Sequence, residues 1–337
     1  MAGSLVNVWR PWQFQGAGRR RGYFEGYYLK VVDPVHGLAL AVIPGVSYDA
    51  AGHGEAFVQV LDGVAATARY HGFAAADFAW GDAARTGATR RGGDHVGAQG
   101  KTRFALRVGE SRFRESGMSL RLPDLRAELR FGSLTPWPTT PLSPGAMGPF
   151  AFVPAMECRH GIVSLHHAVT GELTDGEAPA TTLSPRAVGY VEKDWGRSFP
   201  RSWTWLQTNH LDGESEPCCL TVSAGRVPWL TGAFEGHIAG LLWRGRLLRF
   251  ATYNGSRLRR ERHAGRTVLR LRRGRYRLDV DVRHAPTASL ASPTGGTMLG
   301  RVNESLTATA DVRLRENGRD ILATGARWVG FEVKDAD

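Results

Sequence analysis

The feature that most constrains this chain is a long succession of short alternating segments. Runs in which apolar or aromatic residues alternate with polar ones recur from end to end, for example at residues 23–33, 118–122 and 276–282. Glycine, asparagine or proline separates most of these runs, and helical periodicity is scarce. A period of two with frequent turn residues is typical of antiparallel strands. The sequence therefore predicts an all-β protein, a sandwich or a barrel.

The length of the chain favours two domains. A single hydrophobic core rarely extends over 337 residues. The acidic segment of small residues at 175–185 is the expected linker, which gives an N-terminal domain at 1–180 and a C-terminal domain at 186–337. Each half holds enough predicted strands for one closed antiparallel sheet, whose interior can hold a small ligand.

The formal charge of +11 comes mostly from arginine. In the stretch Leu269-Arg270-Leu271-Arg272 the arginines alternate with leucine, as in a strand with one solvated face. We therefore expect no nucleic-acid partner, and we retain a modest attraction to anionic lipid or substrate as the alternative.

The location of the protein is also an expectation. The apolar run at residues 38–46 is too short to cross a bilayer, and the first ten residues lack the pattern of a signal peptide. A cytoplasmic protein with peripheral membrane contact is predicted. The three cysteines, Cys158, Cys218 and Cys219, do not form the pattern of a disulfide framework or of a zinc site.

Several common kinds of catalytic site are not supported. The chain has neither a phosphate-binding P-loop motif nor the G-x-S-x-G motif of a nucleophilic serine. The histidines His160, His166 and His167 lie close in sequence, but adjacent strand residues point to opposite faces. No metal and no cofactor is therefore predicted.

Acidic residues inside aromatic segments are the strongest candidates for chemistry. Carboxylates are rarely buried unless they are paired, and Lys193 or Arg159 could serve as such partners in a purely structural role. A carboxyl group in an apolar pocket instead has a raised pKa and can act as a general acid. The acidic residues in this setting are Glu25, Glu157, Glu192, Asp194 and Glu235.

Tryptophans are the second group of residues that indicates a candidate site. Trp195, Trp203 and Trp205 lie close in sequence, and Trp203, Trp205, Gln207 and Asn209 would share one face of a strand. An aromatic wall can stabilise a carbocation through its π face. Ordinary core packing is the alternative.

Five sequence blocks together resemble the tocopherol cyclase family. They occur in the order expected for that family and extend over nearly the whole chain. The blocks are Tyr23-Phe-Glu-Gly-Tyr-Tyr-Leu-Lys30, Pro144-Gly-Ala-Met-Gly-Pro-Phe-Ala-Phe-Val-Pro154 with Met156-Glu-Cys158, Gly189-Tyr-Val-Glu-Lys-Asp-Trp-Gly-Arg-Ser-Phe-Pro200, Trp205-Leu-Gln-Thr-Asn209 and Phe250-Ala-Thr-Tyr-Asn-Gly255. Tyr27 stands where the family leads us to expect tryptophan.

The resemblance implies two lipocalin-like antiparallel β-barrels in tandem, a fold shared with carotenoid 1,2-hydratases. It also implies a cofactor-independent cyclase. In that reaction an acid protonates the double bond of a prenylated benzoquinol, and the phenol oxygen traps the cation to give a chromanol.

We assign roles to the candidate residues on this basis. Asp194 is the expected general acid, with Glu192 on the same strand face and Glu157 and Glu25 as alternatives. The other expected site residues are Trp195, Trp203, Trp205 and Tyr253, which would line the substrate, and Gln207, Asn209 and His160, which would orient the phenol.

Two other functions remain open from the sequence. A hydratase acting on an isoprenoid alkene would use the same acid and add water. A non-catalytic carrier of a prenylquinone or lipid would use the same apolar cavity. The oligomeric state is not indicated by the sequence.

Overall fold

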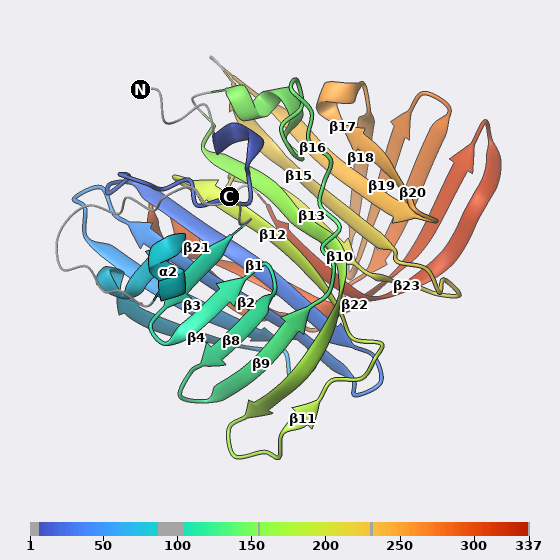
Figure 1. The fold of residues 1–337 in the computed structure, drawn as a ribbon. Coiled ribbons are helices and arrows are strands. Elements are labelled where there is room, and N and C mark those ends of the chain that lie inside the picture. The colour runs from blue at the N-terminus through green and yellow to red at the C-terminus, as the bar shows by residue number, and fades with distance from the viewer. Residues whose placement is uncertain (1–6, 87–103, 154–155, 230–231, 336–337) are drawn as a thin grey trace. The chain divides into compact units, whose positions relative to one another are not determined.

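A computed structural model describes residues 7–86, 104–153, 156–229 and 232–335. Strands dominate it, and they form two large antiparallel sheets (Figure 1). The prediction of an all-β fold with two antiparallel barrels is confirmed. Among the described residues, no helix is long and apolar enough to cross a membrane.

The first sheet holds the strands of the N-terminal part of the chain together with β12, and β11 (Thr181–Thr182) pairs beside it with β10. Its strands are, in spatial order, β4 (Thr67–Ala74), β3 (Gly54–Asp62), β2 (Leu38–Tyr48), β1 (Tyr23–Asp33), β12 (Val188–Gly196), β10 (Cys158–Asp175), β9 (Leu125–Phe131), β8 (Gly117–Arg121), β7 (Ser111–Arg114), β6 (Ala105–Val108) and β5 (Phe78–Trp80).

The second sheet is built from the later strands. Its order is β17 (Arg246–Ala251), β16 (Gly232–Trp243), β15 (Cys219–Trp229), β13 (Trp203–Thr208), β23 (Arg319–Lys334), β22 (Thr297–Glu316), β20 (Tyr276–Arg283), β19 (Arg266–Arg273) and β18 (Arg257–His263). Two short strands extend it: β14 (His210–Leu211) pairs with β23, and β21 (Ala288–Thr294) pairs with β22.

The described helices are single turns. They are η1 (Asn7–Trp9), η2 (Ala75–Asp77), α2 (Asp82–Thr86), η3 (Gly148–Phe152) and η4 (Thr252–Asn254).

Two patterns of burial explain why the strands lie where they do. In β20 every second residue is buried, including Leu278, Val280 and Val282, and the residues between them face solvent. This is the alternation of a strand with one face on a core. The central strand β1 differs, because nearly all of its side chains are buried and both faces are therefore covered.

The contacts of the chain divide it into two compact units. The first contains residues 1–60, 69–199 and 291–300, and the second contains residues 61–68, 200–290 and 301–337. β12 lies within the first unit although it follows the segment expected as a linker, so this unit extends further along the chain than residue 180.

Each unit has its own apolar core. Tyr27, Leu29 and Val191 belong to the core of the first unit. Leu206, Leu269 and Phe331 belong to the core of the second unit.

Candidate active site

Three neighbouring strands of the first unit carry most of the candidate acidic residues. β12 pairs on one side with β1 and on the other with β10, and Asp194 lies opposite His160 in this register. Directly opposed residues share a face of a sheet. His160, Glu192 and Asp194 therefore share the face that points away from the apolar core of this unit.

His160 lies between the two carboxylates. Its Nδ1 is 3.0 Å from Asp194 Oδ1, and its Nε2 is 3.6 Å from Glu192 Oε2. The hydroxyl of Tyr190 donates a hydrogen bond of 2.5 Å to Glu192 Oε2. These four side chains form a connected acid–base cluster, which we call the His160 cluster.

The cluster holds a proton at neutral pH. Burial by itself disfavours the charged imidazolium, but the negative charges of Glu192 and Asp194 and the hydrogen bond to Asp194 outweigh that effect. Together they raise the pKa of His160 to about 9. The proton therefore resides on an imidazolium flanked by two carboxyl groups, and its positive charge offsets the repulsion between Asp194 and Glu192.

The two carboxyl groups differ in exposure. The Glu192 side chain is 5% exposed, and the Asp194 side chain is 24% exposed. Asp194 is thus the carboxyl group that a bound molecule can reach. Glu192, fixed by Tyr190, is placed to hold the imidazolium.

The same three side chains could hold a metal ion. His160, Glu192 and Asp194 each offer a ligand atom, and these atoms lie within 4.8 Å of one another. One imidazole and two carboxylates would suit a divalent ion of the first transition row. The nitrogen ligand would have to give up its proton first, because the pKa of His160 lies near 9.

Glu25 lies on the opposite face of these strands, inside the first barrel. Its Oε1 is 2.7 Å from Lys193 Nζ, and neither side chain is exposed. Its carboxylate also accepts hydrogen bonds from the backbone N–H of Gln15 and from the hydroxyl of Tyr23. Glu25 is therefore held as a paired carboxylate, apart from the His160 cluster.

Trp195 also lies on that inner face. The ammonium group of Lys193 lies 4.5 Å from the centroid of its ring and 5.1 Å from that of Tyr27. Such cation–π contacts stabilise a buried ammonium. The structure does not bring Trp195 together with Asp194, although the two residues are adjacent in sequence.

Glu157 immediately precedes β10. Its backbone carbonyl accepts hydrogen bonds from the N–H groups of Arg197 and Ser198, and its side chain is half-buried. The structure places this residue at the end of the strand that carries His160.

The remaining predicted site residues belong to the second unit. Trp203, Trp205 and Gln207 alternate along β13 with Thr204 and Leu206, so they share the face opposite that unit's core. The side-chain amide of Gln207 donates a hydrogen bond of 2.7 Å to Asn209 Oδ1. Tyr253 lies in η4. Of the four residues expected to share one strand face, Trp203, Trp205 and Gln207 do so, whereas Asn209 follows the end of β13 at Thr208.

The sequence interpretation missed Tyr190 and gave His160 a different role. Tyr190 is two residues from Glu192 on the same strand, so strand periodicity could have revealed it. The bridging position of His160 depends on the register between β10 and β12, which local sequence does not specify.

Comparisons with known proteins agree with this architecture. The model of the family described as tocopherol cyclase-like matches residues 125–334. Two curated relatives are "Probable tocopherol cyclase, chloroplastic" of Oryza sativa subsp. japonica and "Tocopherol cyclase, chloroplastic" of Zea mays. Each is 35% identical over 72 residues, which is 21% of this chain and 15% of the relative.

Two solved structures resemble the whole fold. CghA aligns with a TM-score of 0.53 at 12% identity and covers 94% of this chain and 89% of its own. A protein assigned as an AttH from Nitrosomonas europaea aligns with a TM-score of 0.50 at 14% identity, covering 94% and 92%. At these identities the likeness establishes the fold alone. Since the family model covers more than half of the chain, this protein belongs to the tocopherol cyclase-like family.

Proposed function

We propose that this protein is a cofactor-independent cyclase that closes a prenylated benzoquinol to a chromanol. The observation that carries the proposal is the His160 cluster, in which a protonated imidazole lies 3.0 Å from a partly exposed carboxyl group. An acid-catalysed cyclisation needs a proton donor of this kind, and membership of the family supports the reaction class.

The proposed reaction conserves atoms and protons. The proton held by His160 passes from Nδ1 to Asp194, and Asp194 delivers it to one carbon of the prenyl double bond. A C–H bond forms, and a tertiary carbocation remains at the other carbon. The phenol oxygen then forms the C–O bond and releases its own proton to Asp194, which restores the cluster.

Electrostatics favour this sequence of steps. Once the proton has left, the cluster consists of a neutral imidazole and two carboxylates. The two carboxylates are held in place before the reaction begins, and their negative charge faces the developing carbocation. Charges positioned in advance in this way stabilise a transition state efficiently. Glu192, which Tyr190 holds in place, would keep His160 oriented through each cycle.

The test is turnover of a phytyl-substituted benzoquinol by the purified full chain under reducing conditions. We expect a single chromanol enantiomer with the mass of the substrate. Asp194→Asn should lower the rate by about 100-fold or more, because it removes the proton donor. Glu172→Gln, an exposed carboxylate on β10 far from the cluster, is the matched control and should keep full activity.

Other products would point to other functions. A product heavier by one water would indicate a hydratase. Unchanged quinol bound in a stoichiometric amount would indicate a carrier. Full activity of Asp194→Asn would contradict the proposed acid.

We also propose that the outer face of β18, β19, β20 and β22 contacts anionic membrane surfaces, where such a substrate resides. Arginines outnumber acidic residues on this face. One cross-strand row consists of Arg257, Arg272, Arg277 and Arg315. The remaining charged residues of the face are Arg259, Arg266, Arg270, Arg283, Arg313, Glu261, Asp279, Asp281 and Asp311, with Asp320 of the adjoining strand β23 beside them.

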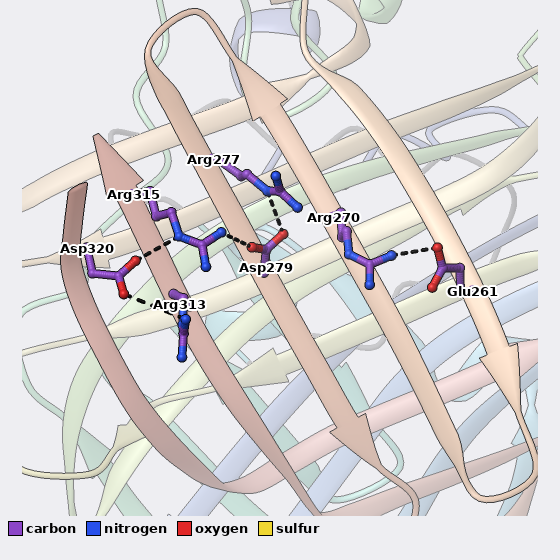
Figure 2. A network of polar contacts seen from close by, with 7 residues as sticks. All are labelled: Glu261, Arg270, Arg277, Asp279, Arg313, Arg315 and Asp320. Carbon is purple, nitrogen blue, oxygen red and sulfur yellow. Dashed lines mark hydrogen bonds and ion pairs between the residues drawn. The ribbon is translucent and has the colours of Figure 1, made fainter. Parts of the chain in front are cut away.

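Figure 2 shows how part of this charge is neutralised. Arg315 bonds to Asp279 and Asp320, at 2.9 and 2.8 Å, and Arg270 bonds to Glu261 at 2.5 Å. Arg257 and Arg272 have no ion pair among the described residues, so the face retains a positive charge.

This proposal is tested by sedimentation with vesicles. We expect binding to phosphatidylglycerol vesicles but not to phosphatidylcholine vesicles, and the binding should weaken from 50 to 300 mM salt because surface charges are screened. Arg257→Gln with Arg272→Gln should weaken the association several-fold. Arg69→Gln, on the first unit, is the control. Equal binding to both kinds of vesicle would contradict an electrostatic contact.

A further inference from the structure

Two arginines of β18 point into the second barrel. Arg260 lies opposite Leu269 and Arg262 opposite Thr267, and Leu269 and Thr267 are fully buried. The neighbouring Arg259 is exposed on the outer face. The side chains of Arg260 and Arg262 are only 18% and 23% exposed. Neither residue takes part in the His160 cluster.

Both guanidinium groups converge on one hydroxyl. Thr204 Oγ1 accepts a hydrogen bond of 2.7 Å from Arg260 Nη1 and one of 3.2 Å from Arg262 Nη2. Thr204 is fully buried on β13, which is not adjacent to β18 in the sheet, so the two side chains extend across the interior. Because the hydroxyl only accepts in these two contacts, its own proton remains available to a further acceptor.

One donor of this arginine pair has no partner in the protein. Within the described residues, Arg262 Nε is buried and has no hydrogen-bond partner. Burial and the nearby charge of Arg260 lower the pKa of Arg262, and Glu235 offsets this only in part. The neighbouring His284 adds no positive charge at neutral pH, because burial and Arg262 lower its pKa.

Two carboxylates reach this pair from the rim. Glu235 Oε1 lies 2.9 Å from Arg260 Nη2, and Asp335, which follows β23, forms an ion pair with Arg262. The side chain of Glu235 is half-exposed and that of Asp335 is mostly exposed. Exposed ion pairs contribute little free energy, so either carboxylate can yield its place to another anion.

We propose that Arg260, Arg262 and Thr204 form a binding site for one oxyanion, a carboxylate or a phosphate group, in the second barrel. Two guanidinium groups match the oxygens of such groups in charge and geometry, and the Thr204 hydroxyl supplies a third donor. The contact of Glu235 with Arg260 shows that a carboxylate can pair with this guanidinium group.

Isothermal titration calorimetry of the full chain with inorganic phosphate and with dodecanoate tests the site, at constant ionic strength in chloride. We expect one equivalent of anion to bind. Binding of both probes would mean that the oxyanion suffices, and binding of dodecanoate alone would mean that it must be carried on an apolar chain. Absence of binding by either probe would overturn the proposal.

Variants separate this site from adventitious binding. Arg260→Gln with Arg262→Gln should weaken binding at least tenfold, whereas Arg246→Gln, an exposed residue of β17 in the same unit, should leave it unchanged. Glu235→Gln should tighten binding several-fold because it removes the competing carboxylate, and a gain of affinity cannot arise from misfolding. Unchanged affinity in Glu235→Gln, or in the double arginine variant, would refute the site.

Discussion

At the scale of single residues, the imidazole of His160 determines how the site responds to pH. Its pKa of about 9 lies above the ordinary value of 6.5. The site therefore holds its proton at neutral pH and loses it as the pH rises through about 9. We expect turnover to fall over that range, and a rate–pH profile of the purified enzyme measures it.

The same shift predicts a change in stability. Because the folded state binds this proton more tightly than the unfolded state, its contribution is fully present below pH 6.5 and is lost as the pH rises towards 9. The free energy of unfolding in urea should decline across this window. His160→Gln should flatten the decline, and an equally steep decline in this variant would assign it to another group.

The buried ion pair of Glu25 and Lys193 has a structural role that a variant can expose. Lys193→Met should destabilise the protein by about 3–5 kcal/mol, because it leaves the Glu25 carboxylate buried without its counterion. Urea unfolding measures this loss. Adding Glu25→Gln to Lys193→Met should recover part of it.

An exposed ion pair provides the control for that measurement. Asp311→Asn removes the partner of Arg283 on the surface, where both side chains are more than half exposed. We expect a change below about 1 kcal/mol. A loss in Lys193→Met no larger than this would contradict the structural role of the buried pair.

Sequence reasoning at this scale was limited by long-range pairing. The alternation of a strand was enough to put Glu192 and Asp194 on one face. It could not reveal that Glu25 and Trp195 face the barrel core beside Lys193, since that depends on which side of each strand is covered. Nor could it reveal the bridging position of His160, which belongs to a strand distant in sequence.

At the scale of elements, the fit between β10 and β12 positions the His160 cluster. β10 contains irregularities in its pairing with β12 between Ile162 and His167, and beyond them Gly189 lies opposite His167. A Cβ atom on Gly189 would lie 2.3 Å from His167 Nε2. The absence of a side chain at this position therefore allows the two strands to approach while His167 stays buried.

Gly189→Ala tests this requirement. The added methyl group should shift β12 against β10, lower the free energy of unfolding by about 1–3 kcal/mol and reduce turnover. Gly232→Ala on β16 is the control, because a Cβ atom there meets nothing within 4 Å. Equal thermal stability of Gly189→Ala and the unchanged protein would show that His167 can move aside without cost.

The strands themselves were largely predictable, because each carries its own alternation and turn residues. The run expected at 276–282 corresponds to β20, and the run expected at 23–33 corresponds to β1. The assignment of β12 to the first sheet was harder to predict from the sequence. It follows an acidic segment that has the composition of a linker, yet it pairs with β1 and β10 in the middle of the first sheet.

At the scale of the whole molecule, the two-barrel architecture followed from the length of the chain, the number of strands and the family resemblance. These features did not predict that each unit contains a segment from the other half of the sequence. Residues 291–300 belong to the first unit, where Ala291 exchanges two hydrogen bonds with the buried side chain of Gln59. Such pairing over 232 residues leaves no local signal in the sequence.

That exchange has a consequence for synthesis on the ribosome. The chain emerges from its N-terminus, so the first unit lacks residues 291–300 until residue 300 has left the exit tunnel, although the strands of the first sheet end at Gly196. By then most of the second half has also been translated. The first sheet can therefore form early, but its unit is expected to be completed only when most of the second half has been made. A nascent chain stalled before that point would leave the Gln59 side chain without its partner Ala291.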